Sequence, residues 1–272
     1  MKVREVSATA DWRTTPLTNS DCLYRILSSG RLLNPLLEAP FVTNKIFRFD
    51  WLHVADLGVA PLFLGNLFFR LLQIIPGSSH KEKCAALYQE IQAYYEEQQV
   101  EDRFDSLLPT MFIHKKKDYV LRGSAAKIRH LVPFAAKITR ELLTPADPVH
   151  DALIQAAHHL HETYRALSST MANPCEHMKE HGLKFALQYV ALHDHLNPGN
   201  PKAFRIKPKL HLFMHVTSDD SLPARHWTYR DEDFGGSVAR MARRRGGMLS
   251  CGKTALQVLQ KFKLRNPMVR IG

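Results

Sequence analysis

The sequence predicts a mostly helical protein that carries one or two short strands. Three observations lead to this prediction. Residues 80–98 place apolar side chains, such as Leu87 and Ile91, at helical spacing. Two segments begin with a helix-capping residue followed by proline, namely Asp147-Pro148 and Asn173-Pro174. Alternation of polar and apolar residues, the pattern of a half-buried strand, is confined to two short stretches.

The predicted helices follow one another through the middle of the chain. The first covers residues 57–75, where Asn66 and Arg70 interrupt a long apolar run, so we expect a buried core helix and not a membrane span. Asp56 would cap its start, and Pro76-Gly77 would end it. Further helices are expected at 80–98, at 125–143 with a kink at Pro133, at 148–168 and at 174–196.

The two candidate strands lie beside acidic residues. Residues 45–49 alternate and lead directly into Asp50, and residues 225–230 alternate just before a second acidic cluster. We expect one or both to pair as short strands.

Charge is distributed unevenly along the chain. Residues 1–201 contain 22 Lys/Arg and 21 Asp/Glu, a net of +1, whereas residues 202–272 contain 15 and 5, a net of +10. The turn at 197–201 coincides with this change. We therefore predict an N-terminal segment (1–44), a helical domain (45–201) and a basic C-terminal region (202–272). A block of one sign favours nucleic acid as the partner, with an acidic protein or an unstructured tail as alternatives.

The sequence also indicates where the protein acts. The first residues, Met1 to Val6, lack the apolar stretch of a secretory signal, so secretion is not expected. Four cysteines lie far apart and form no C-x-x-C, which is typical of a reducing compartment and not of a disulfide framework. We expect a nuclear or cytoplasmic protein without a membrane partner. Homo-oligomerisation is left open.

Residues Gly247–Thr254 match the phosphate-binding pattern G-x-x-x-x-G-K-[ST] in full. That loop needs an apolar strand before it and a parallel sheet around it. An arginine-rich stretch precedes the match and only 18 residues follow it. Binding of a nucleoside triphosphate is therefore not expected.

Fifteen histidines include two pairs at i, i+4 spacing, His177 with His181 and His211 with His215. This spacing can direct two imidazoles to one metal ion, and Cys175 extends the first pair to C-x-H-x-x-x-H. No fourth ligand with local spacing is evident. Ordinary hydrogen-bonded histidines are the simpler interpretation.

Three motifs occur in the order seen in one family of enzymes. Phe49-Asp50-Trp-Leu-His53-Val-Ala-Asp-Leu-Gly-Val resembles the second-aspartate motif of cut-and-paste transposases of the CACTA and Plavaka type. Lys209-Leu-His211-Leu-Phe-Met-His215 resembles their K-x-H-x-x-x-H segment, and residues 226–236 resemble the segment with the final glutamate, here Glu232. The resemblance covers residues 45–250.

The resemblance implies a ribonuclease H-like α/β core, of which one or two strands remain here, interrupted by an all-helical insertion. It implies Mg²⁺-dependent hydrolysis and strand transfer at DNA phosphodiesters. Asp50 and Glu232 would hold the metal and His53 would orient the site, because Mg²⁺ prefers oxygen ligands. The expected DNA-binding side chains are basic or imidazole groups of the C-terminal region: Lys209, His211, His215, Arg240, Arg243, Arg244, Arg245 and Lys253.

One part of the family pattern is missing from this sequence. The first catalytic aspartate of these transposases ends an apolar strand, but residues 1–44 contain only Asp11 and Asp21, and neither follows such a run. The chain thus resembles the C-terminal part of a transposase or a degenerate copy. The alternative is a non-catalytic nucleic-acid-binding or helical protein-interaction module.

Overall fold

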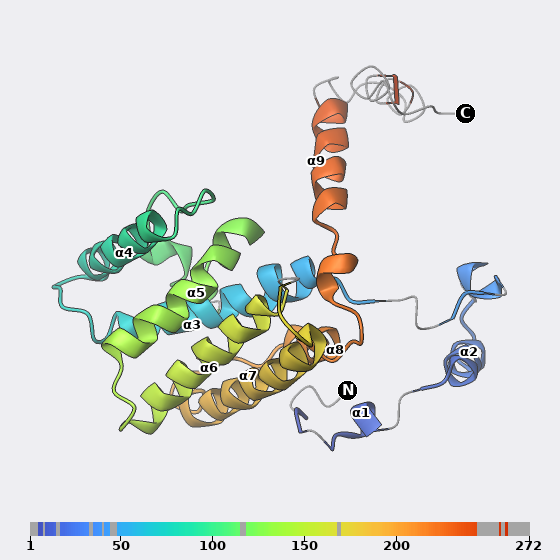
Figure 1. Cartoon of the computed structure of the whole chain (residues 1–272), viewed down its shortest axis with the longest axis horizontal. Helices are drawn as coiled ribbons and strands as arrows, with labels where there is room; N and C mark the ends of the chain where they lie inside the picture. Colours follow the sequence, from blue (N-terminus) through green and yellow to red (C-terminus); the bar gives the residue numbers. More distant parts are fainter. Residues whose placement is uncertain are drawn as a thin grey trace. The chain divides into compact units, whose positions relative to one another are not determined.

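The computed structural model is all-α in the residues it describes, which are 5–7, 9–14, 17–32, 35–39, 41–43, 48–114, 118–167, 170–243, 256, 259 and 260 (Figure 1). The chain divides into two compact units, Met1–Trp227 and Thr228–Gly272, and each is treated separately below. The predicted boundary at residue 201 and this division fall at different positions.

The helices of the first unit are α1 (Asp11–Thr14), α2 (Asn19–Ser28), α3 (Ala60–Leu71), α4 (His80–Glu97), α5 (Ala125–Leu142), α6 (Pro148–Arg165), α7 (Pro174–Leu196) and α8 (Pro208–Thr217). Short 3-10 turns lie at Pro35–Glu38, Pro109–Met111 and Pro223–Arg225. The second unit contains α9 (Tyr229–Arg243).

The helices predicted in the middle of the chain are confirmed. Of the predicted start signals, Asp147 caps its helix, whereas Asn173 precedes α7 without a side-chain cap bond. Ser79, Ser124 and Asp147 each accept backbone N–H bonds as N-caps of α4, α5 and α6. Proline occupies the first turn of α6 and α7, where its missing N–H has no helical partner to lose.

The strand predicted at residues 225–230 is wrong. A 3-10 turn ends at Arg225 and α9 begins at Tyr229, where the Glu232 N–H already bonds to the Thr228 carbonyl. Local helix signals outweigh an alternation of six residues, and no strand is present in the described part of the chain to pair with it. For the other candidate, residues 45–47 lie outside the described residues and Arg48 and Phe49 have no strand geometry.

The long apolar helix starts earlier than predicted. Leu52–Val59 forms a π-helix, labelled η3, which runs directly into α3. Asp56 therefore lies inside the helix, so its predicted role as N-cap is wrong. The Asp50 carboxylate takes up that position instead, accepting the backbone N–H of His53 at 3.0 Å. π-Helical segments are rare and frequently lie at functional sites.

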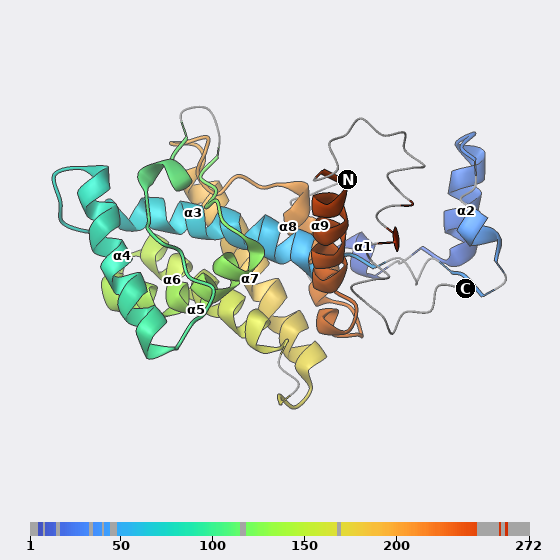
Figure 2. The same cartoon turned by 90° about the horizontal axis from the view of Figure 1, so that it is seen from above.

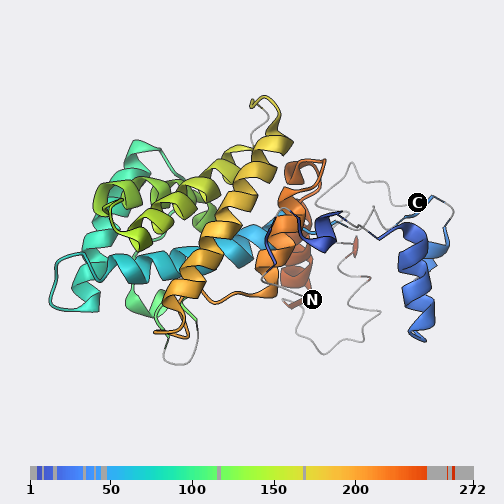
Figure 3. The same cartoon turned by 90° about the horizontal axis from the view of Figure 1, so that it is seen from below.

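The η3–α3 helix is the centre of the core. α5, α6 and α7 form a layer against it, and α4 packs beside α5 (Figure 2). α7 crosses the central helix, with the Phe63 and Phe185 rings 5.6 Å apart, and α8 packs on both α7 and η3 (Figure 3). Among the described helices, Leu52–Leu71 is long and apolar enough to cross a membrane, but 78% of its apolar window is buried within the fold. Such a helix alone says little about membrane association.

One buried asparagine ties two other segments to α3. The Asn66 amide donates to the carbonyls of Leu62 and Tyr119 at 2.7 and 3.1 Å, and its oxygen accepts the Phe204 N–H at 2.7 Å. Phe204 is buried at a positive φ of 44°, a strained conformation for a bulky residue, which this bond helps to hold. Gly65 permits the close approach, since a Cβ there would lie 2.7 Å from Tyr119 and Leu121 backbone atoms.

Candidate functional site

Asp50 and His53 form a compact pair at the start of η3. The Asp50 Oδ2 atom lies 2.6 Å from His53 Nδ1 and 3.0 Å from the His53 backbone nitrogen. The Asp50 side chain is 16% exposed, whereas the His53 side chain is 51% exposed. The carboxylate is therefore engaged at the helix start, and the imidazole faces solvent.

Arg48 and two residues from later in the chain, Asp219 and His226, lie close to this pair. Arg48 forms an ion pair with Asp219. The pKa of His226 is lowered, mainly by burial and then by Arg48, while Asp219 and Asp50 act in the opposite direction. The first unit thus brings two carboxylates, an arginine and a histidine to the same neighbourhood, as the sequence alone could not show.

The two α8 histidines lie under the N-terminal segment. Their Nε2 atoms are 3.0 Å apart, and the Trp12 ring packs on both, with centroid distances of 4.9 Å to His211 and 4.3 Å to His215. Burial lowers the pKa of His215 to about 4, with His211 and Arg13 adding to the effect. Burial also lowers the pKa of His211. The lowered pKa values favour the neutral form of both rings, which removes the positive charge that would attract phosphate.

Beside His215 lies a cavity of about 630 Å³ that is lined by side chains of both charge signs, including Arg13, Glu176 and Lys179. The Arg13 guanidinium donates at 2.9 Å to the Ser218 hydroxyl, which also belongs to the lining. The mixed lining does not single out an anionic or a cationic ligand.

Lys209 has a structural contact in the first unit. Its Nζ donates to the Leu57 carbonyl of the π-helix at 3.0 Å, and its aliphatic chain lies where a Gly58 Cβ would fall. Burial lowers the pKa of this amine, with Lys207 contributing. The amine therefore helps to satisfy the irregular backbone of η3, whatever else it contacts.

The remaining predicted residues belong to the second unit. Glu232 lies in the first turn of α9, and Arg230 and Arg240 are exposed on the same helix. The backbone of Arg243 ends α9. Arg244, Arg245, Lys253 and the P-loop-like stretch Gly247–Thr254 lie outside the described residues.

A buried carboxylate that sequence patterns assigned wrongly lies at the centre of the first unit. Asp56 is fully buried, and accepts hydrogen bonds from the Tyr164 hydroxyl at 2.6 Å and from Arg129 at 3.1 Å. The Arg129 guanidinium also stacks over the Trp227 ring at 4.9 Å. The carboxylate therefore joins η3 to α5 and α6.

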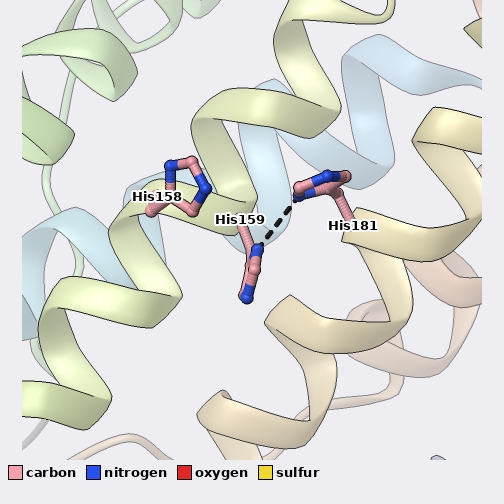
Figure 4. A group of neighbouring side chains, drawn as sticks. All are labelled: His158, His159 and His181. Atoms are coloured by element: carbon pink, nitrogen blue, oxygen red, sulfur yellow. Dashed lines mark hydrogen bonds between the residues drawn. The ribbon is translucent and has the colours of Figure 1, made fainter.

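A histidine-rich cluster lies between α6 and α7. Two groups of potential metal ligands share His181: one adds His158 and His159 (Figure 4), and the other adds Glu162 and His177. In each group the ligand atoms lie within 4.8 Å of one another. The i, i+4 spacing indicated His177 and His181, but Glu162 comes from the facing helix and no local spacing revealed it.

Comparisons with known proteins give no match: no family model, no curated protein and no solved structure corresponds to this chain.

The implied Mg²⁺ can be tested against the donor atoms around Asp50. Within the described residues, neither ligand cluster includes Asp50 or Glu232. Asp50 Oδ2 is already bonded to His53. A two-metal site requires several oxygen ligands, and the described surroundings of Asp50 do not supply this set, so we derive no catalytic step through the metal.

Proposed function

We propose that this chain is a transposase-derived DNA-binding protein whose basic C-terminal region contacts the phosphate backbone. The observation that carries the proposal is the charge distribution, because residues 202–272 hold 15 Lys/Arg against 5 Asp/Glu. Duplex DNA presents a dense row of phosphates, and cations that neutralise them give affinity without sequence preference. Such a protein would act in the nucleus or cytoplasm.

The polarity of α9 supports this assignment. Its acidic residues, Asp231 and Glu232, lie in the first turn, where they complement the helix dipole. Arg240 is exposed towards the other end, and Arg243 to Arg245 follow in sequence. By contrast, several cations of residues 202–209 are engaged within the first unit: Lys207 pairs with Asp118 at 2.6 Å, and Lys202 donates to the His114 carbonyl at 3.0 Å. The arginines of 240–245 are therefore the stronger candidates for phosphate contact.

Catalysis enters the proposal as an ancestral property. In the transposase interpretation, Asp50 and Glu232 would be Mg²⁺ ligands, and His53 would orient Asp50. The Asp50–His53 bond of 2.6 Å is compatible with that orienting role. The first family aspartate has no counterpart in residues 1–44, so we propose that the isolated chain binds DNA but cleaves it poorly.

A second candidate function is self-association through the N-terminal segment. Large apolar side chains are well exposed there, including Tyr24 at 73%, Leu27 at 60% and Leu32 at 97%. Exposed apolar side chains grouped in one segment are typical of an interaction surface. Sedimentation of the wild type and of the Leu27→Glu, Leu32→Glu double variant tests it: a dimer that the variant abolishes supports self-association, and a monomeric wild type rules it out.

DNA binding is tested with two triple variants of the full chain. In the first, Arg243, Arg244 and Arg245 become Gln. In the matched control, three exposed lysines of the first unit become Gln: Lys81, Lys137 and Lys184. Both lose three positive charges. We expect the arginine variant to lose most of its affinity for duplex DNA in a fluorescence anisotropy titration, while the lysine variant keeps it. Equal losses would contradict the assignment to the C-terminal region.

A further inference from the structure

The α6–α7 pair carries an unusual concentration of metal-ligating side chains. His158, His159 and Glu162 lie on α6, and His177 and His181 lie on α7. These helices pack more extensively on each other than any other pair in the described chain. The cluster therefore lies on a rigid scaffold and not on a loop, which favours a defined ligand geometry.

The spacing of the donor atoms matches what a small transition-metal ion requires. His177 Nε2 lies 3.0 Å from Glu162 Oε2, and His159 Nδ1 lies 3.0 Å from His181 Nδ1. Zinc binds imidazole nitrogen at about 2.0–2.1 Å in a tetrahedral arrangement, which places neighbouring donor atoms about 3.3 Å apart. Within the group Glu162, His177 and His181, the first two donor atoms are thus already at nearly the required separation, and all three lie within 4.8 Å of one another.

From this geometry we infer that Glu162, His177 and His181 form a zinc-binding site that joins α6 to α7. Two histidines one helical turn apart and a carboxylate from the facing helix are ligand types that zinc accepts. The His177 and His181 rings are stacked, with centroids 4.3 Å apart, so both project from the same side of α7. Glu162 is only 8% exposed, as expected of a carboxylate with a fixed partner.

Surrounding contacts already orient the carboxylate. Arg165 donates to both Glu162 oxygens at 2.8 and 2.9 Å. A carboxylate offers about four lone-pair positions, so it can keep this arginine while binding an ion. Hydrogen bonds of this kind commonly fix metal-ligating carboxylates. The Arg165 side chain is 55% exposed and is free to adjust its position.

The overlapping cluster is a poorer ligand set. His158 and His159 are consecutive in α6, and adjacent helical residues project about 100° apart, so they do not share a face. The Nδ1 atom of His158 also accepts a hydrogen bond from the Arg140 guanidinium at 2.9 Å, which uses the one lone pair of that nitrogen. His159 remains close enough to His181 to act as a fourth ligand after a small rotation.

The test uses the full chain, stripped of metal with a chelator and titrated with Zn²⁺ by calorimetry. We expect one ion per chain, and a rise in Tm on zinc addition, because binding to the folded state alone stabilises it. Co²⁺ as a probe should give the intense visible absorption of a tetrahedral site. Absence of stoichiometric binding by the wild type would overturn the inference, whatever the variants do.

Four variants identify the ligands. His177→Gln and His181→Gln should each weaken zinc binding at least 100-fold, whereas His195→Gln, an exposed histidine on the same helix, should bind like the wild type. His158→Gln should also bind normally. Circular dichroism and the metal-free Tm verify that each variant folds. Normal binding by His177→Gln, or loss of binding in His158→Gln with retention in His177→Gln, contradicts the proposed ligand set.

Discussion

The hydroxyl of Tyr164 should stabilise the fold more than an ordinary tyrosine hydroxyl does. It donates to the fully buried Asp56 carboxylate at 2.6 Å. Tyr164→Phe removes this donor and keeps the ring, which packs on Trp51 at 5.1 Å. A hydrogen bond to a charged group contributes about 1.5–3 kcal/mol, and a neutral one about 0.5–1.5 kcal/mol. We therefore expect a loss of about 1.5–3 kcal/mol in the free energy of unfolding.

The matched control is Tyr88→Phe. The Tyr88 hydroxyl donates to the neutral Phe104 carbonyl at 2.7 Å, so a similar bond is removed without a carboxylate. Its loss should cost about 0.5–1.5 kcal/mol. Urea unfolding followed by far-UV circular dichroism measures both values, and at this chain length each kcal/mol shifts Tm by about 2–4 °C.

A double-mutant cycle checks the cause. If Asp56 is the acceptor, Tyr164→Phe should cost much less in an Asp56→Asn background, because the charge that strengthens the bond is gone. The reasoning is refuted if Tyr164→Phe costs no more than Tyr88→Phe, or if its cost is unchanged beside Asp56→Asn.

Three further predictions concern packing, pH and catalysis. Gly65→Ala should lower the free energy of unfolding, measured in urea, by about 1–3 kcal/mol, as in other overpacked cores. The reason is that the added Cβ would lie 2.7 Å from backbone atoms. Gly199→Ala is the control and should not destabilise the protein, because the atom nearest to its added Cβ is 4.0 Å away. The lowered pKa of His215, about 4 against an ordinary 6.5, means that only the unfolded chain gains this proton between these values. As the pH is lowered from 6.5 to 4, the free energy of unfolding should therefore decrease by about 1–2 kcal/mol, after allowance for the partial exposure of the ring. The decrease should be smaller in His215→Gln. Asp50→Ala should change Mg²⁺-dependent DNA cleavage little, because the wild type should cleave poorly; robust cleavage abolished by both Asp50→Ala and Glu232→Ala would falsify this.

Local signals predicted the helices well. The starts of α4, α5 and α6 are capped by Ser79, Ser124 and Asp147. Each cap accepts a backbone N–H from no more than three residues further along, so it acts without tertiary contacts. The prediction of Asp56 as a cap failed because its carboxylate oxygens accept hydrogen bonds from residues far along the chain. Arg129 is 73 residues away and Tyr164 is 108 residues away. No pattern in a short window contains such a contact.

The candidate sites show the same limit. The spacing of His177 and His181 predicted two imidazoles on one face of a helix, as the stacked rings confirm. Glu162 joins them only because α6 packs against α7, so it could not be found by spacing. Lys209 and the α8 histidines were predicted to contact DNA, a prediction that could not include their contacts with the π-helix and with Trp12 in the folded chain.

DNA binding by the basic C-terminal region is tested most directly by the salt dependence of duplex affinity. Each phosphate contact contributes a slope of about −0.9 to the plot of log affinity against log salt concentration. The wild type should show a steep slope, the Arg243, Arg244, Arg245→Gln variant a slope smaller by about 2–3, and the Lys81, Lys137, Lys184→Gln control the wild-type slope. Affinity that does not change with salt, or equal slopes for the two triple variants, would contradict DNA binding through this region.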